Sequence, residues 1–123
     1  MAGERLAAAV DGGGSGSRLL LFDRRGRALA LFEGPPLNYA ALGPRRFLES
    51  LRRLLEPVGA ARPSVGWFVF SLAGASAYRA EVEELLRREL GPAEVTLLTD
   101  VEATYLAAAR GRDAIVVSSG PGR

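Results

Sequence analysis

The chain has 123 residues and a formal net charge of +2, and this length suits one globular domain rather than two. It contains no Cys and no His, which excludes disulfides, thiolate or imidazole metal ligands, and catalysis by a Ser-His or Cys-His pair. All 16 basic residues are Arg, which excludes a Walker-type phosphate loop and Schiff-base chemistry and leaves carboxylates, hydroxyls, backbone amides, Arg and hard metal ions.

The first third of the chain predicts three antiparallel strands. Apolar runs cover residues 6–10, 19–22 and 28–32, and Gly-bearing turns separate them. Short apolar runs joined by such turns are typical of a β-meander. Pro35-Pro36 ends this unit, because Pro donates no ladder hydrogen bond.

The remainder alternates between helical and strand patterns. Helices are predicted for residues 44–56, 78–90 and 100–110, and strands for residues 65–72, 95–98 and 114–117. The strand at 65–72 is apolar on both faces, which favours a central place in a sheet. The order is therefore βββ-α-β-α-β-α, followed by one more strand. A meander followed by βα units in one mixed five-stranded sheet is the α/β topology called ribonuclease-H-like.

The Gly-rich turn at residues 12–17 is the first candidate site. Such a turn lets backbone N–H groups approach a phosphate closely, although a plain hairpin turn has the same composition. It is not a dinucleotide-binding fingerprint, because Ser17 stands where that pattern needs its third Gly and a strand follows instead of a helix. Asp11, at the end of the preceding strand, could hold Mg²⁺ against a polyphosphate.

Four further features each allow a structural and a functional interpretation. Thr99-Asp100 begins a predicted helix, so Asp100 is either an N-cap or a general base for a substrate hydroxyl. Asn38 is the only Asn of the chain and is either a turn residue or a polar ligand. Small residues at 71–76 form either a packing turn or the floor of a ligand site, and residues 119–122 form a second Gly-rich turn.

Composition also bounds the partners and the location. The Arg residues are scattered and often stand near Glu, which indicates a solvated surface and no nucleic-acid partner. No segment reaches the ~20 apolar residues of a membrane span, and the charged N-terminus does not resemble a signal peptide, so we expect a cytoplasmic protein without a membrane partner. The lack of Lys, Cys, Gln and His is typical of a heat-adapted, high-GC proteome, which suggests a thermophile.

Taken in order, the motifs resemble one known family. The chain contains, in this order, Asp-Gly-Gly-Gly-Ser-x-Ser, a loop Asn, Ser-Leu-Ala-Gly, Thr-Asp-x-x-Ala and Val-Val-x-Ser-Gly-x-Gly. This combination is similar to the pattern of the N-acetylglucosamine kinase / BadF-type ATPase family. That family is part of the sugar kinase, Hsp70 and actin superfamily. The resemblance covers nearly the whole chain.

The resemblance implies phosphoryl transfer from MgATP to an amino sugar such as N-acetylglucosamine, with ATP and Mg²⁺ as cofactors. It places Asp11 near the metal, Asp100 as the catalytic base that also contacts the sugar, and Asn38 and Gly74 as sugar-binding residues. The implied phosphate-binding residues are Gly12, Gly13, Gly14, Ser15 and Ser17 in a first loop and Ser119, Gly120 and Gly122 in a second.

In this family two such domains clamp the nucleotide, so we expect the chain to be the N-terminal half of a longer protein. Residues 1–112 would form the ribonuclease-H-like domain, and residues 113–123 would begin the second domain. The apolar strand at 114–117 would then seek a partner, which predicts self-association or a homodimer. Without the second domain we expect no kinase activity, because water reaches the phosphates.

Two alternatives remain open. Within the same family, the protein could be an ATPase that activates a partner dehydratase or reductase by coupling hydrolysis to domain closure. Outside it, a Holliday-junction-resolvase-like nuclease has the same fold and would use Asp11 and Asp100 in a two-metal site. Such a site needs further carboxylates near the C-terminus, where only Asp113 follows Glu102.

Overall fold

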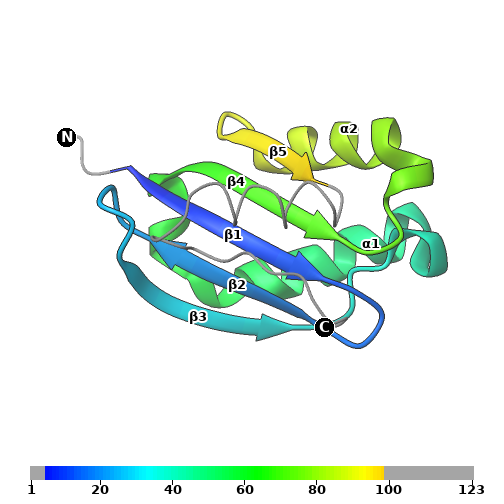
Figure 1. Cartoon of the computed structure of the whole chain (residues 1–123), viewed down its shortest axis with the longest axis horizontal. Helices are drawn as coiled ribbons and strands as arrows, with labels where there is room; N and C mark the ends of the chain where they lie inside the picture. Colours follow the sequence, from blue (N-terminus) through cyan, green and yellow to red (C-terminus); the bar gives the residue numbers. More distant parts are fainter. Residues whose placement is uncertain (1–4, 99–123) are drawn as a thin grey trace.

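The computed structural model describes residues 5–98, in which three successive strands are followed by two helices that alternate with two further strands (Figure 1). The elements are β1 (Leu6–Gly12), β2 (Ser17–Phe22), β3 (Ala28–Gly34), α1 (Tyr39–Leu55), β4 (Val65–Leu72), α2 (Arg79–Leu90) and β5 (Glu94–Leu98). Two 3₁₀ segments, Glu56–Ser64 and Ser76–Tyr78, precede β4 and α2. No helix within residues 5–98 is long and apolar enough to cross a membrane.

The strands form one mixed sheet in the order β3-β2-β1-β4-β5. β1, β2 and β3 pair antiparallel as a meander, whereas β4 pairs parallel with β1 on one side and with β5 on the other. The predicted mixed five-stranded α/β sheet is confirmed. The third predicted helix, at 100–110, and the strand at 114–117 lie outside the described residues.

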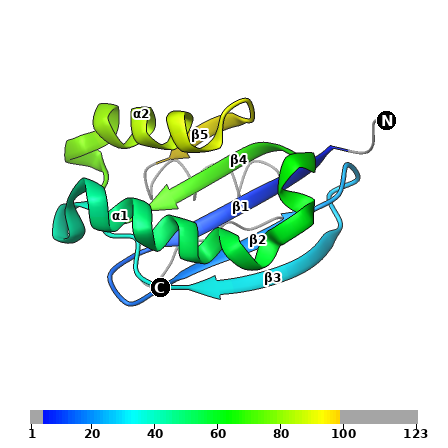
Figure 2. The same ribbon diagram turned by 180° about the vertical axis from the view of Figure 1, so that it is seen from behind.

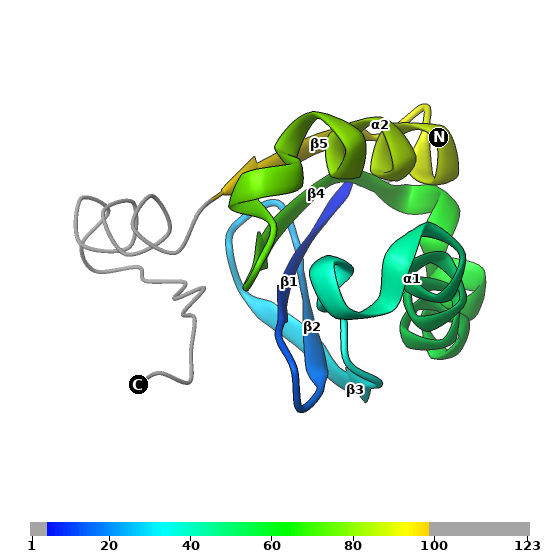
Figure 3. The ribbon, with the colours of Figure 1, turned by 90° about the vertical axis from the view of Figure 1, so that its right-hand side faces the viewer.

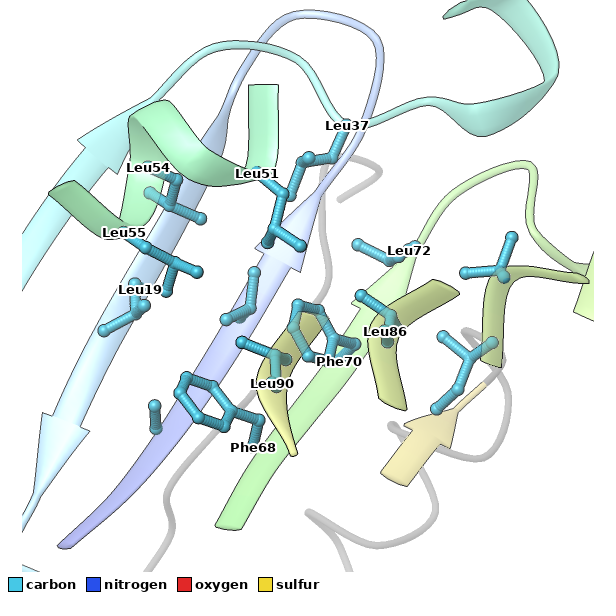
Figure 4. Close-up of a cluster of buried hydrophobic side chains, with 14 of the residues drawn as sticks. Leu19, Leu37, Leu51, Leu54, Leu55, Phe68, Phe70, Leu72, Leu86 and Leu90 are labelled. Carbon is cyan, nitrogen blue, oxygen red and sulfur yellow. The ribbon is translucent and has the colours of Figure 1, made fainter. Parts of the chain in front are cut away.

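Both helices cover the same face of the sheet, as the view from behind and the edge-on view show (Figures 2 and 3). Alternate strand residues point into this layer, because side chains along a strand alternate between the two faces. Val10, Phe68, Phe70 and Leu72 come from β1 and β4, and they meet leucines of α1 and α2 such as Leu51 and Leu86 (Figure 4). This single apolar layer forms the core.

The opposite face of the sheet is less covered than the sequence predicts. β4 takes the central place expected of it, between β1 and β5, but its Trp67 side chain is 43% exposed. The Trp67 indole N–H donates a hydrogen bond to Thr96 Oγ1 of β5 at 2.9 Å. Leu29 and Leu31 of the edge strand β3 are also exposed. At Trp67 the apolar character of β4 therefore does not produce burial on both faces.

Helix α1 begins earlier than predicted because it consists of two parts. Asn38 caps a first turn, and the Asn38 side chain accepts a hydrogen bond from the Ala41 amide at 3.2 Å. Gly43 then leaves helical geometry with φ of 79°, and Pro44 starts the longer part of the helix. Gly43-Pro44 reads as a helix start in the sequence, so only the part from Pro44 onward was predicted.

An ion pair joins the two helices and predicts a pH dependence of stability. Arg52 Nε and Nη2 donate to the Glu89 carboxylate at 2.9 and 2.8 Å. This contact and the nearby Arg charges hold the pKa of Glu89 below its usual 4.5, although burial alone would raise it. A carboxyl whose folded pKa is depressed stabilises the fold above its unfolded pKa, and this contribution disappears as pH falls through the lower folded value.

Glu89→Gln should therefore lower the urea midpoint at pH 7, and its difference from the wild type should shrink between about pH 5 and pH 3. The matched control is Glu84→Gln, because the Arg88–Glu84 pair on the same helix is exposed at both partners and should contribute little at either pH. A difference between wild type and Glu89→Gln that stays constant with pH would contradict the assignment.

Candidate functional site

Three loops that are distant in the sequence meet at one end of the sheet, where β1 and β4 finish (Figure 1). The Leu37 amide donates to Gly13 O at 3.1 Å, which ties the segment after β3 to the turn after β1. The Ala73 amide donates to Gly12 O at 2.9 Å, which ties the segment after β4 to the same turn. The sheet order thus brings the first Gly-rich turn, Asn38 and Gly74 together.

Gly12 is buried between the neighbouring loops and has a packing function. A Cβ at this position would lie 2.8 Å from Leu37 Cβ and 3.1 Å from Leu72 Cδ2, which is too close for any side chain. Gly12 also pairs with Ser17 in the β1–β2 ladder, so the free turn consists only of residues 13–16. It is shorter than the loop at 12–17 that the sequence predicts.

The outermost part of this turn carries the amides that can bind an anion. The Gly13 amide already donates to Gly16 O at 3.0 Å. Gly14 and Ser15 are exposed, and among residues 5–98 neither of their amides has a hydrogen-bond acceptor. Adjacent unpaired N–H groups in a Gly-rich turn form a concave anion site. This geometry fits a phosphate at Gly14 and Ser15.

Ser17 differs from the other predicted phosphate-binding residues because its hydroxyl is already used. Its side chain is only 5% exposed, and Oγ donates to Pro35 O at 2.7 Å. A hydroxyl has a single proton to donate. Ser17 therefore fastens β2 to the segment after β3, and its predicted contact with phosphate stays a prediction.

Asn38 is a helix cap in the structure, and its predicted role as a ligand stays a prediction. Its Oδ1 caps α1, and a Cβ on Gly74 would lie 2.9 Å from that same oxygen, so Gly74 packs directly against it. Gly74 has φ of 78°, a conformation that other residues rarely adopt. The Asn38 Nδ2 group donates to no other described residue, which leaves two N–H bonds for a ligand.

Asp11 lies beside Ser71 at the end of the sheet, where the two residues are partners in the parallel β1–β4 register. Mg²⁺ is usually bound through one or two carboxylates and the phosphates of its substrate, and it keeps several waters. Residues 5–98 hold no group of three or more acids that could cage a metal alone. One carboxylate next to a Gly-rich turn that fits a phosphate nevertheless suits magnesium that arrives with a nucleotide.

A shallow pocket adjoins this end of β4 and β5, lined by Leu72, Ala75, Ser76, Arg79, Leu97 and Leu98. Arg79 spans it, because Nη2 donates to Leu97 O at 2.8 Å and Nε to Glu83 Oε2 at 3.4 Å. This contact fixes the end of β5 to α2, and no motif in the sequence predicts it. The predicted site residues Asp100, Ser119, Gly120 and Gly122 lie outside the described residues.

Among solved structures, the chain is similar to a provisionally assigned N-acetylglucosamine kinase from Chromobacterium violaceum. The two share 27% sequence identity with a TM-score of 0.60, over 88% of this chain. The resemblance inferred from the sequence is confirmed. A second similar structure is component A of (R)-2-hydroxyglutaryl-CoA dehydratase from Acidaminococcus fermentans, with 12% identity and a TM-score of 0.51 over 85% of this chain.

The second likeness concerns the fold alone. Both support an enzyme fold of the sugar kinase and actin-like ATPase type. The chain spans 39% of the length of the kinase and 34% of that of component A. No protein-family model matches the chain, and no curated protein does.

Proposed function

We propose that this chain is the N-terminal domain, of ribonuclease-H-like topology, of an ATP-dependent kinase that phosphorylates an amino sugar such as N-acetylglucosamine. One observation carries the proposal. The Gly-rich turn after β1, the half-buried side chain of Asn38 and Gly74, which packs against Asn38, lie together at one end of the sheet. The 27% identity to the kinase from Chromobacterium violaceum supports it. The likeness to component A extends only to the fold, so it does not favour an activating ATPase.

In the proposed reaction, the amides of Gly14 and Ser15 bind the terminal phosphate of ATP, and the amide of Asn38 orients the sugar. The sugar hydroxyl oxygen attacks the γ-phosphorus, its proton passes to the Asp100 carboxylate, and ADP leaves. Asp11 would hold magnesium, which would neutralise part of the negative charge on the phosphates. Ser119, Gly120 and Gly122 belong to a second phosphate loop in this proposal.

A thermal-shift screen of the intact gene product tests the proposal, with amino sugars and neutral hexoses, each with and without MgATP. We expect an N-acetylated amino sugar to raise the melting temperature, since a ligand that binds only the folded state stabilises it. A coupled assay should then detect ADP release with that sugar. ADP release that does not depend on any sugar would favour the activating ATPase instead.

Gly74→Ala should weaken sugar binding by displacing Asn38. The added Cβ would lie 2.9 Å from Asn38 Oδ1, and φ of 78° adds backbone strain of about 1–3 kcal/mol. We expect a KM for the sugar raised about ten-fold, the effect of losing one hydrogen bond of about 1.4 kcal/mol. The KM for ATP should stay unchanged.

Gly26→Ala is the matched control for this variant. Gly26 has φ of 83°, so it carries the same kind of strain, but nothing lies within 4 Å of its added Cβ. Both variants should lose stability through backbone strain, Gly74→Ala somewhat more because it also displaces the cap of α1, and only Gly74→Ala should affect the sugar. An equal KM for the sugar in the two variants would remove Gly74 and Asn38 from the proposed sugar site.

A further inference from the structure

Ser71 is a buried hydroxyl without a partner, on a strand that is otherwise apolar toward its end. The residue is 1% exposed, and its Oγ has no hydrogen-bond partner among the described residues. A buried polar group left unpaired destabilises the folded state, and most such groups in proteins are paired. Ser17, the other buried serine of the described part, is paired with Pro35 O. Ala would pack at position 71 without this disadvantage.

The position of Ser71 in the sheet relates it to Asp11. The two are partners in the parallel register, so both side chains stand on the same face of the sheet. Phe70 and Leu72, the neighbours of Ser71, point into the core beneath the helices (Figure 4). Ser71 and Asp11 therefore stand on the opposite face.

Ser71 also lies next to the strand that leads to the predicted base. On its other side its register partner is Leu98 of β5, and in the sequence Leu98 precedes Asp100 by two residues. The hydroxyl of Ser71 thus belongs to β4, which lies between β1, the strand that carries Asp11, and β5, the strand that precedes Asp100 in the sequence. No other polar side chain of β4 faces this end of the sheet.

We propose that Ser71 is a positioning residue of the magnesium site at Asp11, an inference that rests on the proposed kinase function. A hydroxyl both donates and accepts, so it can accept from a water bound to magnesium and donate to a carboxylate. Magnesium keeps several of its waters in nucleotide sites, and the groups around those waters orient them. The hydroxyl of Ser71 then gains its partners when MgATP binds.

The first measurement compares Ser71→Ala and Ser17→Ala in the intact protein without ligand. Ser71→Ala should leave the melting temperature unchanged or raise it, because it removes an unpaired buried hydroxyl. Ser17→Ala should lower it, because it breaks the hydrogen bond to Pro35 O. A lower melting temperature for Ser71→Ala would show that the hydroxyl has a structural partner and would overturn the proposal.

The second measurement titrates magnesium at fixed ATP and follows nucleotide binding by calorimetry. Ser71→Ala should require about 10–100-fold more magnesium, the usual effect of removing a group that orients a metal's ligands, while the affinity for ATP without magnesium stays unchanged. In an Asp11→Asn background Ser71→Ala should have no further effect, because the two residues act on the same ion.

The possible failures are distinguishable. If the wild type binds ATP without any magnesium dependence, the proposed kinase function fails, and the role of Ser71 fails with it. If the wild type depends on magnesium and Ser71→Ala has the same dependence, only the role of Ser71 is wrong. An additive effect in the Asp11→Asn background would likewise overturn the link to Asp11.

Discussion

Asp100→Asn in the intact protein should lower kcat by about 10²–10⁴-fold and leave the KM for the sugar within a few-fold. Asn cannot accept the proton of the sugar hydroxyl, whereas it still accepts hydrogen bonds from the sugar. The substitution separates the two interpretations of Asp100 because Asn caps a helix about as well as Asp. A residue that serves only as a cap would tolerate the change.

Kinetics with the cognate sugar and a thermal melt check this prediction together. Glu102→Gln is the matched control, since it neutralises a carboxylate two residues further along and has no part in the proposed reaction. We expect it to keep kcat near the wild-type value. Normal kcat in Asp100→Asn with an unchanged melting temperature would remove Asp100 from the catalytic machinery and leave it as a helix cap.

The secondary structure could be predicted where hydrophobic periodicity decides it. The strand Val65–Leu72 has the predicted bounds, and α2 differs from its prediction by one residue. Pro57 and Gly59 correctly predict the end of a helix, because α1 ends at Leu55, one residue before the predicted end. The chain then continues in a 3₁₀ segment to Ser64, which the sequence did not predict and in which Gly59, with φ of 57°, interrupts the helical geometry.

The turn after β1 shows why the details of the site could not be predicted. Gly is rare in strand interiors, so the sequence predicts that Gly12 belongs to a loop. In the fold Gly12 pairs with Ser17. Leu37 and Leu72 come so close to it that only Gly fits at this position. Those contacts depend on the order of the strands. No local pattern contains that information.

The contacts within the candidate site could not be predicted from the sequence. The sequence identified Asn38 and Gly74 separately, but their contact depends on β4 lying next to β1. The missing partner of Ser71 is likewise a property of the packed structure. The sequence marked Ser71 only as the first of the small residues at 71–76, without showing that its hydroxyl is buried and unpaired.

Gly13→Val should abolish the binding of MgATP while the fold is kept. A Cβ at Gly13 would meet only Ala73 Cβ, at 3.7 Å, which is an ordinary contact. The branched side chain would stand beside the amides of Gly14 and Ser15, which the phosphate must approach. Each hydrogen bond to a charged group contributes about 1.5–3 kcal/mol, so losing both weakens MgATP binding by at least about 100-fold.

Calorimetry with MgATP and a thermal shift with the sugar distinguish this effect from misfolding. Sugar binding should persist in Gly13→Val, because Asn38 is held by its cap to Ala41 and does not depend on the side chain at position 13. The control is Arg25→Val, which places the same branched side chain in the exposed hairpin turn between β2 and β3. It should bind both ligands normally. Equal loss of MgATP binding and sugar binding in Gly13→Val would indicate a folding defect. Normal MgATP binding would exclude the turn after β1 from the phosphate site, because a phosphate held by the amides of Gly14 and Ser15 could not pass the valine methyls.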